Sequence, residues 1–589
     1  MKKLYSLIVS LLIVQYAFAQ WPANYGGVML QSFYWNSFKD TQWTKLTEQA
    51  DELSTYFDAI WVPNSAWCTD GQSMGYDPVY WFRHKSTFGQ LRDLKTMIST
   101  YKAKNVSIIE DVVINHKKPQ GNKVEHGGEM VPSWIDFVNE TVTFGGTTYN
   151  VNWSGADICK NDDGGYTLSQ GWDVTGAYDT GDDFSGYRDL DHTSANVQNN
   201  VKIYLRYLLE GLGYDGFRLD MVKGYAGKYT KLYNEAVNPK FCVGEYWDGY
   251  DAITNWMNST GKTSAAFDFP LKYQLNKACG GNWSALSDKG IAGDPNWSRY
   301  AVTFVDNHDT YEKGSDRLAN NVLAANAIIL GMPGTPCIFL KHWQSYPIGI
   351  GNMILARKAC GLTNQSSIIE QGVSGNGYFI KTQGTKGKVL VLCGFPSYDT
   401  SGFKCIAAGD NFAYYVENGI EVSGLRPGTD NPYTGEIPEC VKPIEGHVYC
   451  YFQGNKDYPS PNIWAFDAQG KSLNTNKTWP GDKMTKVGQD SDQHDIYLWD
   501  AGVATGSNMP TGIVFSTGSG SPQTADFFFY NGGYYDAAGY LTSVPTDIST
   551  PTVTTRIDTS EQTYTLTGQR ASKSYKGLVI KNGKKYIIK

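Results

Sequence analysis

The chain has 589 residues, of which 41% are hydrophobic and 19% are charged, and its formal net charge is -7. This length exceeds the usual size of one domain, and the composition excludes an intrinsically disordered chain, a polytopic membrane protein and a coiled coil. Because no cluster of Lys and Arg interrupts the acidic chain, we expect no nucleic acid partner. Aromatic residues reach 14%. Such rings either fill cores or stack against sugars, and composition alone favours cores.

The first 19 residues predict a secretory signal peptide. Lys2 and Lys3 precede an apolar run at 4–16, and Ala17-Phe18-Ala19 provides the small residues of a cleavage site. We therefore expect cleavage near Ala19 and a secreted protein, extracellular or on the cell surface, with the periplasm as a further location. The run is too short for a convincing spanning helix, so no membrane span is expected.

Ten cysteines are spread between Cys68 and Cys450 without a CxxC pair. A secreted chain gives them the opportunity to form disulfides, but their spacing predicts no particular pairing. The same spacing argues against a zinc site built from thiolates.

Eight short apolar segments in the first 340 residues predict the strands of a closed barrel. They lie at 28–35, 57–63, 106–116, 214–220, 241–247, 265–270, 299–309 and 334–340. Helical patterns between them, as at 41–55, 195–211 and 318–331, indicate a parallel sheet that is buried on both faces. We predict an α/β fold with a (β/α)8 TIM barrel over residues 20–344.

Polar residues follow four of these strands. They are Asn115 with His116, Arg218 with Asp220, Glu245, and His308 with Asp309. Strand ends of this kind meet at the face where such barrels build active sites. Three carboxylates there supply what glycosidic cleavage with retention requires. Arg218 shares a side of its strand with Asp220 and is expected to keep that carboxylate ionised, whereas each histidine either binds sugar hydroxyls or is a buried structural residue.

An insertion at 117–191 is much longer than a usual loop of a barrel and predicts a separate subdomain. It is rich in Gly and in Asp, with Asp179, Asp182, Asp183 and Asp189 close together. Carboxylates and carbonyls crowded with glycine suit calcium, and a solvated acidic loop explains the same residues equally well.

Four strings carry a family resemblance: DVVINH at 111–116, GFRLDMVKG at 216–224, GEYW at 244–247 and FVDNHD at 304–309. They resemble, in order and spacing, the four signature regions of α-amylases of glycoside hydrolase family 13. MLQSFYW at 29–35 and GYDP at 75–78 are similar to the plant and related bacterial members. The resemblance covers about residues 21–418 and implies a barrel, an inserted domain B at 117–191 and an antiparallel domain C.

The resemblance implies a role for each residue of the active site. Asp220 is expected to be the nucleophile, Glu245 the acid/base and Asp309 the stabiliser of the transition state. Six further residues are expected to bind substrate, with the Tyr76 ring stacked on a sugar and Lys223 and Trp247 on the leaving-group side: Tyr76, His116, Arg218, Lys223, Trp247 and His308.

The segment at 178–192 is similar to the calcium-binding stretch of plant-type α-amylases. This implies a first, structural ion held by Asn115, Asp179, Asp189 and the carbonyls of Asp182 and Gly224. It implies a second ion held by Asp162, Asp183, Asp189 and the carbonyls of Phe184 and Tyr187. Calcium would tie domain B to the barrel rim.

The rest of the chain predicts β structure. Alternating residues at 345–418 predict the antiparallel domain C, and the Gly- and Pro-rich stretch at 419–445 a linker. Residues 446–543 resemble a starch-binding β-sandwich of carbohydrate-binding module family 26. Its expected sugar contacts are Trp464, Trp479, Gln523 and Tyr451, with a core role as the alternative for the tryptophans. The tail at 544–589 resembles C-terminal sorting segments of secreted Bacteroidetes-type proteins, and a plain β-hairpin is the alternative.

Together these observations predict a secreted, monomeric, endo-acting retaining α-amylase that cleaves internal α-1,4 bonds. Its expected substrates are starch, amylose, amylopectin and glycogen-like α-glucans. One alternative is a 4-α-glucanotransferase or a maltogenic exo-acting relative that uses the same site. Another is a starch-binding surface protein that has lost catalysis.

Overall fold

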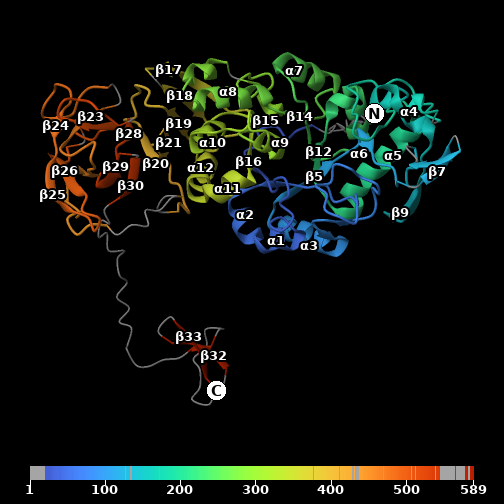
Figure 1. Ribbon diagram of the computed structural model, residues 1–589, viewed down its shortest axis with the longest axis horizontal. Helices are drawn as coiled ribbons and strands as arrows, with labels where there is room; N and C mark the ends of the chain where they lie inside the picture. The colour runs from blue at the N-terminus through green and yellow to red at the C-terminus, as the bar shows by residue number, and fades with distance from the viewer. Residues whose placement is uncertain are drawn as a thin grey trace, which may run out of the picture.

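The computed structural model describes residues 20–543, except positions 122, 127, 133–134, 172, 289, 376, 410, 427–429, 431–436, 468–469, 506, 511, 525 and 538, together with three short strands near the C-terminus. The predicted signal peptide and most of the tail therefore lie outside the described residues. The barrel occupies one end of an elongated molecule, and the last β-sheets before the tail occupy the other end (Figure 1).

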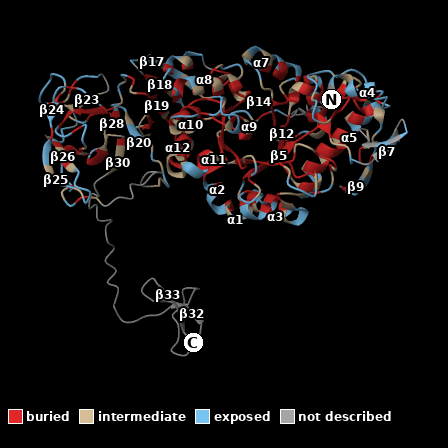
Figure 2. Cartoon of the chain, in the orientation of Figure 1, coloured by how far each residue is buried: buried red, intermediate tan, exposed pale blue. Residues whose placement is uncertain are grey.

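Eight parallel strands close into a barrel in the order β1-β16-β15-β14-β13-β12-β5-β2. Each predicted apolar segment contains one of them, which confirms the predicted TIM barrel. The strands are β1 (Met29–Gln31), β2 (Ala59–Val62), β5 (Ser107–Val112), β12 (Gly216–Leu219), β13 (Phe241–Gly244), β14 (Ala265–Phe267), β15 (Ala301–Phe304) and β16 (Thr335–Phe339). Every residue of these strands is buried, because side chains fill the inside of the barrel and helices cover its outside (Figure 2).

Helices between the strands form the outer layer of the barrel. They are α1 (Trp43–Glu48), α2 (Ala50–Tyr56), α3 (Leu91–Lys102), α5 (Ala195–Arg206) with its π-helical extension (Tyr207–Leu212), α6 (Gly227–Val237), α7 (Tyr250–Ser259), α8 (Phe269–Cys279), α9 (His308–Glu312), α10 (Val322–Gly331), α11 (Leu340–Ser345) and α12 (Pro347–Cys360). Short 3-10 turns occur at Val222–Gly224, Trp283–Ser287 and Ser298–Tyr300.

Helix α10 is apolar on nearly all sides because it lies between the barrel and a further sheet. It contacts β15 and β16 on the barrel side and β19 and β21 on the other side. A helix that is hydrophobic all round is expected to be buried in this way. Arg357 of α12 stabilises the connection between α10 and β16, because its buried guanidinium donates to the carbonyls of Leu330, Met332 and Gly334.

The inserted segment (residues 117–191) consists of small elements on the rim of the barrel. They are β7 (Lys123–His126), β8 (Glu129–Pro132), β9 (Glu140–Phe144), β10 (Thr147–Val151), the 3-10 turns Gly155–Asp157 and Asp162–Gly165, α4 (Tyr166–Ser169) and β11 (Arg188–Asp189). β11 pairs with β6 (His116–Lys117), which directly follows barrel strand β5. The insertion is thus hydrogen-bonded to the end of a barrel strand.

The middle sheet follows the barrel and has the strand order β17-β18-β19-β21-β20. Its strands are β17 (Ser367–Ser374), β18 (Gly377–Gln383), β19 (Lys388–Cys393), β20 (Phe403–Gly409) and β21 (Phe412–Glu417). The sequence predicted antiparallel structure from 345, whereas residues 347–360 form α12 and the sheet begins at Ser367. The glycines at 349 and 351 favour a turn in the sequence, but here they permit close packing against Leu323 and Tyr56.

The C-terminal sandwich (β22–β30) contains a five-stranded sheet, β25-β26-β22-β29-β30, and a four-stranded sheet, β24-β23-β27-β28. Its strands are β22 (His447–Gln453), β23 (Pro461–Phe466), β24 (Asp482–Lys483), β25 (Thr485–Gln489), β26 (Asp495–Val503), β27 (Gly512–Thr517), β28 (Phe527–Phe528), β29 (Gly533–Asp536) and β30 (Gly539–Ser543). Residues from both sheets, such as Phe452 and Phe515, share one core. The three strands described in the tail are β31 (Tyr564–Thr565), β32 (Gly577–Lys581) and β33 (Lys584–Ile588).

All ten cysteines lie within the described residues and are free thiols. No helix in the described part of the chain is long and apolar enough to cross a membrane.

Candidate active site

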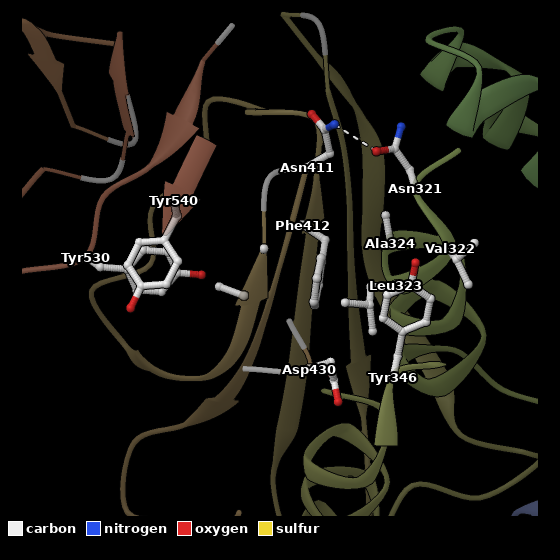
Figure 3. A pocket seen from close by; sticks show the side chains of 12 residues that line it. Asn321, Val322, Leu323, Ala324, Tyr346, Asn411, Phe412, Asp430, Tyr530 and Tyr540 are labelled. Carbon is white, nitrogen blue, oxygen red and sulfur yellow. Dashed lines mark hydrogen bonds between the residues drawn. The ribbon is translucent and has the colours of Figure 1, made fainter. Parts of the chain in front are cut away.

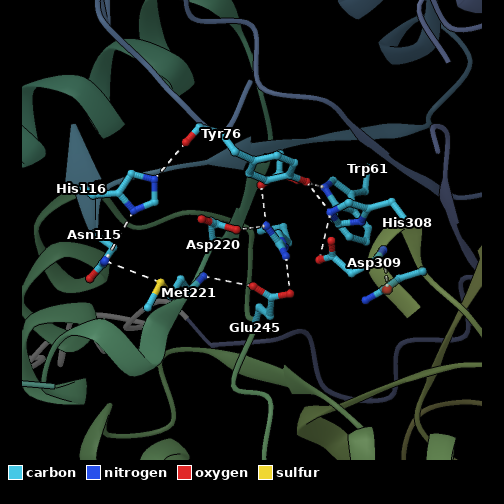
Figure 4. A network of polar contacts seen from close by, with 12 residues as sticks. Trp61, Tyr76, Asn115, His116, Asp220, Met221, Glu245, His308 and Asp309 are labelled. Carbon is cyan, nitrogen blue, oxygen red and sulfur yellow. Dashed lines mark hydrogen bonds and ion pairs between the residues drawn. The ribbon is translucent and has the colours of Figure 1, made fainter. Parts of the chain in front are cut away.

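The predicted carboxylates meet at the carboxyl ends of the barrel strands (Figure 4). Asp220 directly follows β12, Glu245 directly follows β13, and Asp309 lies in the first turn of α9 after β15. β12 and β13 are neighbours in the barrel. The fold therefore brings together three acids that are far apart in the sequence.

Arg218 is the charge on which this cluster is built. Its Nη1 lies 2.7 Å from Asp220 Oδ1 and 2.8 Å from Asp111 Oδ1, and its Nη2 lies 2.8 Å from Glu245 Oε1. The guanidinium is almost fully buried, so these contacts are poorly screened by water. One cation thus offsets three carboxylates, which would otherwise repel one another.

Asp111 is a member of the site that the sequence analysis missed. It is fully buried, and its Oδ2 accepts hydrogen bonds from the Tyr76 hydroxyl at 2.8 Å and from Trp61 Nε1 at 3.1 Å. Burial raises the pKa of Asp111 to about 6, and Arg218 opposes that shift. Its position as the first residue of DVVINH was the available signal, but it lies inside an apolar strand rather than after it.

The protonation of Asp220 is set by two opposing effects. Burial raises the pKa of Asp220 well above its usual value, and the positive charge of Arg218 works against this. The predicted role of Arg218 in favouring the ionised carboxylate therefore rests on the direct 2.7 Å contact.

His308 is held as a neutral imidazole. Burial lowers the pKa of His308 to about 3. The hydrogen of the Tyr76 hydroxyl goes to Asp111, so His308 Nε2 donates to that hydroxyl at 2.7 Å, and Nδ1 accepts from Gln31 Nε2 at 2.8 Å. The rings of Tyr76 and His308 are stacked, with an interplanar angle of 3°. The proton of His308 is thus fixed on Nε2.

Asp309 and Glu245 are each oriented by a further donor. Trp35 Nε1 donates to Asp309 Oδ1 at 3.1 Å. The backbone N–H of Met221 donates to Glu245 Oε2 at 3.2 Å, and Met221 has a left-handed backbone with φ of 42°. Such a conformation in a residue other than glycine costs energy and is found disproportionately at functional sites.

His116 is buried beside the predicted subsite. Its Nε2 donates to the carbonyl oxygen of Tyr76 at 2.9 Å, and its ring stacks on Phe184 of the inserted segment. Burial lowers the pKa of His116 to about 4, so this imidazole is also neutral. The structure thus gives His116 a position between the Tyr76 loop and the insertion.

Lys223 and Trp247 lie at the edge of the site. Lys223 Nζ is 3.0 Å from Asp248 and 3.5 Å from Asp182. The Trp247 ring stacks on Phe269, while Lys313 lies over the ring at 4.1 Å from its centroid. Both side chains already have partners within the chain.

Two of the residues predicted for a first calcium ion have buried oxygen atoms that accept no hydrogen bond from a described residue. Asn115 Oδ1 and Asp179 Oδ2 are buried and have no hydrogen-bond partner in the described part of the chain. A Cβ at Gly224 would lie 1.9 Å from Asn115 Oδ1, and one at Gly181 would lie 2.1 Å from the Lys223 carbonyl oxygen. Glycine is therefore required for this close approach between the inserted segment and the barrel rim. The oxygen-rich donor set fits calcium.

The residues predicted for a second ion are also close together, but part of this group is occupied. Asp162, Asp183 and Asp189 can bring one oxygen each within 4.8 Å of one another. Asp162 Oδ2 already lies 2.5 Å from Arg188 Nη1, and Oδ1 accepts the backbone N–H of Asp189. Burial and the neighbouring acids raise the pKa of Asp189 to about 9. The Asp189 carboxylate accepts hydrogen bonds from Asn115 Nδ2 and from the backbone N–H of Phe184.

The C-terminal sandwich brings two of the predicted ring residues together. Trp464 and Trp479 lie 5.8 Å apart, and the Trp479 side chain is 39% exposed. Gln523 is exposed, and its backbone forms an isolated β-bridge with Ser516 of β27. β27 pairs with β23, which carries Trp464.

The prediction for Tyr451 was wrong. Its side chain is only 2% exposed, and its hydroxyl donates to the Lys442 carbonyl. The ring packs with Ile496 and Tyr534 on the outer side of the five-stranded sheet, so it cannot stack on a sugar.

Residues 52–347 match the family model described as "Alpha amylase, catalytic domain". "Probable alpha-amylase 2" of Arabidopsis thaliana is 30% identical over 357 residues, which cover 56% of this chain and 78% of that protein. "Alpha-amylase 3, chloroplastic" of the same organism is 31% identical over 342 residues, covering 54% of this chain and 35% of that protein. "Glucan 1,4-alpha-maltotetraohydrolase" of Roseateles saccharophilus is 27% identical over 388 residues, covering 59% and 64%.

Replacing Arg218 by Met should destabilise the protein in a pH-dependent manner. Without the guanidinium, the pKa values of Asp111 and Asp220 rise further in the folded state only. Acids with a raised folded-state pKa stabilise the fold at low pH and lose that contribution as the pH rises through the folded-state pKa. The loss of unfolding free energy, measured by urea denaturation of the barrel, should reach roughly 3–5 kcal/mol at pH 8 and be smaller at pH 5.

Arg357→Met is the matched control, because that buried guanidinium contacts carbonyl oxygens and no carboxylate. Its cost should be the same at both pH values. An equal loss at pH 5 and pH 8 for Arg218→Met would contradict the proposed role of this arginine.

Proposed function

The chain belongs to the alpha-amylase family and is a glycoside hydrolase that acts on α-glucans, and from this premise we propose that it is an endo-acting, retaining α-amylase. We propose starch, amylose, amylopectin and glycogen-like glucans as substrates and internal α-1,4 bonds as the point of cleavage. The observation that carries this proposal is the shared contact of Asp220 and Glu245 with Arg218. Two carboxyl groups on one guanidinium lie close enough for a nucleophile and an acid/base to act on the same bond.

The proposed reaction has two displacements. Glu245 donates its proton to the glycosidic oxygen while the Asp220 carboxylate attacks the anomeric carbon, which releases the leaving glucan and forms a glycosyl ester. Glu245, now ionised, takes a proton from water, and the water oxygen attacks the same carbon and displaces Asp220. Both attacks invert the configuration, so the product retains it.

The surrounding residues are proposed to position these groups and the sugar. Asp309 is held by Trp35 and offers negative charge to the positive charge that develops on the sugar ring. Neutral His308 and Tyr76 form a stacked polar wall, which suits the hydroxyls and apolar face of a glucose residue. His116 acts by holding the Tyr76 backbone, and Lys223 and Trp247 are proposed for the leaving-group side.

One alternative function uses the same chemistry, and a second alternative has lost it. A glucanotransferase or a maltogenic exo-acting relative would carry the same three acids, and one relative is named a maltotetraohydrolase. An inactive starch-binding protein would need a defect elsewhere, because the carboxylates and Arg218 are in contact. The products, rather than the acids, separate these possibilities.

Replacing Glu245 by Gln should lower kcat on soluble starch by roughly 10²- to 10⁴-fold, since the variant cannot transfer a proton. Glu235→Gln is the control, because Glu235 lies exposed on α6 and pairs only with Lys231. A Glu245→Gln enzyme that retains full kcat would exclude Glu245 as the acid/base.

The wild-type products should identify the reaction. Hydrolysis with retention releases the α-anomer first, which proton NMR detects, and endo attack gives a broad set of short oligosaccharides at early times. Accumulation of cyclic or longer glucans would identify a transferase, and a single short product from the start would identify an exo-acting enzyme.

We further propose that calcium binds Asn115, Asp179, Asp189 and the carbonyls of Asp182 and Gly224. The orphaned oxygens of Asn115 and Asp179 support this site, and the ion would add positive charge beside Asp189. Its role would be structural, since it would join the inserted segment to the barrel rim beside Asn115. A second ion at Asp162, Asp183, Asp189 and the carbonyls of Phe184 and Tyr187 is proposed as weaker, because Arg188 already pairs with Asp162.

Removing calcium with EGTA should lower the melting temperature, and added calcium should restore it. A ligand present at 100 times its Kd stabilises by about 2.7 kcal/mol, which corresponds to a shift of a few degrees. Asp179→Asn should weaken this response, whereas Asp183→Asn should leave most of it. An unchanged melt in EGTA would refute the calcium proposal.

For the rest of the chain we propose a signal peptide at 1–19, a catalytic barrel at 20–344 with domain B at 117–191, domain C at 345–418 including α12, and a linker at 419–445. Residues 446–543 are proposed as a starch-binding module similar to carbohydrate-binding module family 26, and 544–589 as a sorting tail. Secretion and a monomeric state belong to the same proposal. The neighbouring Trp464 and Trp479 rings, with exposed Gln523, support sugar binding by the module.

Replacing Trp479 by Ala should weaken adsorption to granular starch by roughly 10-fold, which equals about 1.4 kcal/mol. The reason is the loss of an exposed ring that can stack on a glucose face. The control is Met509→Ala, which removes another exposed apolar side chain of the sandwich. Undiminished adsorption of the Trp479 variant would remove this residue from the binding surface.

A further inference from the structure

A cavity of about 280 Å³ lies where the barrel, the middle sheet and the C-terminal sandwich meet (Figure 3). Asn321 and Tyr346 immediately precede helices α10 and α12 and contribute to one side. Phe412 comes from β21, and Tyr530 and Tyr540 come from the sandwich. All three bodies are therefore needed to form this cavity, and it contains none of the residues of the candidate active site.

Aromatic rings stand on both sides of the cavity. Tyr530 and Tyr540 pack together, with ring centroids 4.4 Å apart, and in Figure 3 they face Phe412 and Tyr346 across the space. Tyr346, Tyr530 and Tyr540 are partly exposed. Rings arranged in this way can contact the apolar faces of a pyranose, and binding sites of this type are common at domain interfaces.

The polar groups of the cavity suit a neutral ligand. Asn411 Nδ2 donates to Asn321 Oδ1 at 2.8 Å, and Asn411 Oδ1 accepts no hydrogen bond from any described residue. The carboxylate of Asp430 accepts the backbone N–H groups of Ile348 and Gly349, so the start of α12 offsets its charge. No Lys, Arg or His is among the described residues that line the cavity. An uncharged molecule with many hydroxyls matches these groups better than an anion does.

Tyr530 connects the C-terminal sandwich to the middle sheet beside the cavity. It packs against the buried side chains Leu390, Leu392 and Ala413 of the middle sheet and also against the core of the sandwich. A ligand in the cavity would contact both bodies and would stabilise their docking by mass action.

We propose that this cavity is a second carbohydrate site, which binds a short segment of a neutral α-glucan between the middle sheet and the C-terminal sandwich. The choice of an α-glucan rests on the proposed function. A volume of about 280 Å³ is near the lower limit of small-molecule sites and accommodates a short segment rather than a long chain.

The test is hydrogen–deuterium exchange of the full-length Glu245→Gln protein with maltoheptaose, because this variant preserves the ligand from hydrolysis. The sugar should slow exchange in two separate regions. One is the cleft around 216–224 and 304–312, and the other is the cavity around 406–414 and 539–543. Tyr540→Ala in the same background should weaken the cavity response at least tenfold in maltoheptaose concentration and leave the cleft response unchanged.

Tyr178→Ala is the matched control, because it removes an exposed tyrosine from the inserted segment. If Tyr540→Ala speeds exchange of β21 without sugar, the sandwich has been undocked, and Asn411→Ala then provides the test from the opposite wall. Protection of the cleft without the cavity would refute the second site while the proposed function stands. Protection of neither region would refute the proposed α-glucan substrate itself.

Discussion

The carboxylates at the end of this barrel depend on one buried guanidinium. Arg218 contacts Asp111, Asp220 and Glu245, and the first and last of these come from strands on either side of its own. Three carboxyl groups so close together need a counter-charge when they are buried, and arginine provides several donors in a fixed plane. The geometry of the acids is therefore inseparable from the strand order of the barrel. Tyr76, His308 and Trp61 extend this network through Asp111, so the polar floor of the site is a single hydrogen-bonded unit.

The inserted segment is joined to the barrel rim by contacts of the same kind. Asn115 follows β5, and its Nδ2 donates to Oδ1 of Asp189, which lies on β11 opposite His116. The glycines at 181 and 224 allow the two backbones to come together. Carboxylates accumulate at this junction as they do around Arg218, and Asp179 Oδ2 has no hydrogen-bond partner among the described residues. At the barrel end, the side chain of Arg218 offsets the buried charge of the carboxylates.

Sequence reasoning predicted the barrel well because its eight strands are apolar and follow a regular order. It also predicted that Asp220, Glu245 and Asp309 follow barrel strands, as they do, since polar residues after apolar strands are conspicuous. Asp111 was missed because it lies within β5, whereas the predicted acids were sought after the ends of the strands. Tyr451 was misplaced because HVYCYFQ has large apolar residues on both faces of the strand, so alternation does not tell which face is exposed. The α12 boundary was missed because PIGIGN contains residues that are typical of turns. In each of these cases tertiary packing decided the outcome.

The contact of Tyr530 with two cores has a consequence for how this protein can be divided. A C-terminal domain that is joined to an enzyme only by a linker can often be removed without effect on the enzyme. Here the surface around Leu390, Leu392 and Ala413 is completed by a side chain of the sandwich. An enzyme shortened after the middle sheet would present that apolar surface to water and would be prone to aggregate. The sandwich therefore helps to shield an apolar surface of the middle sheet from water.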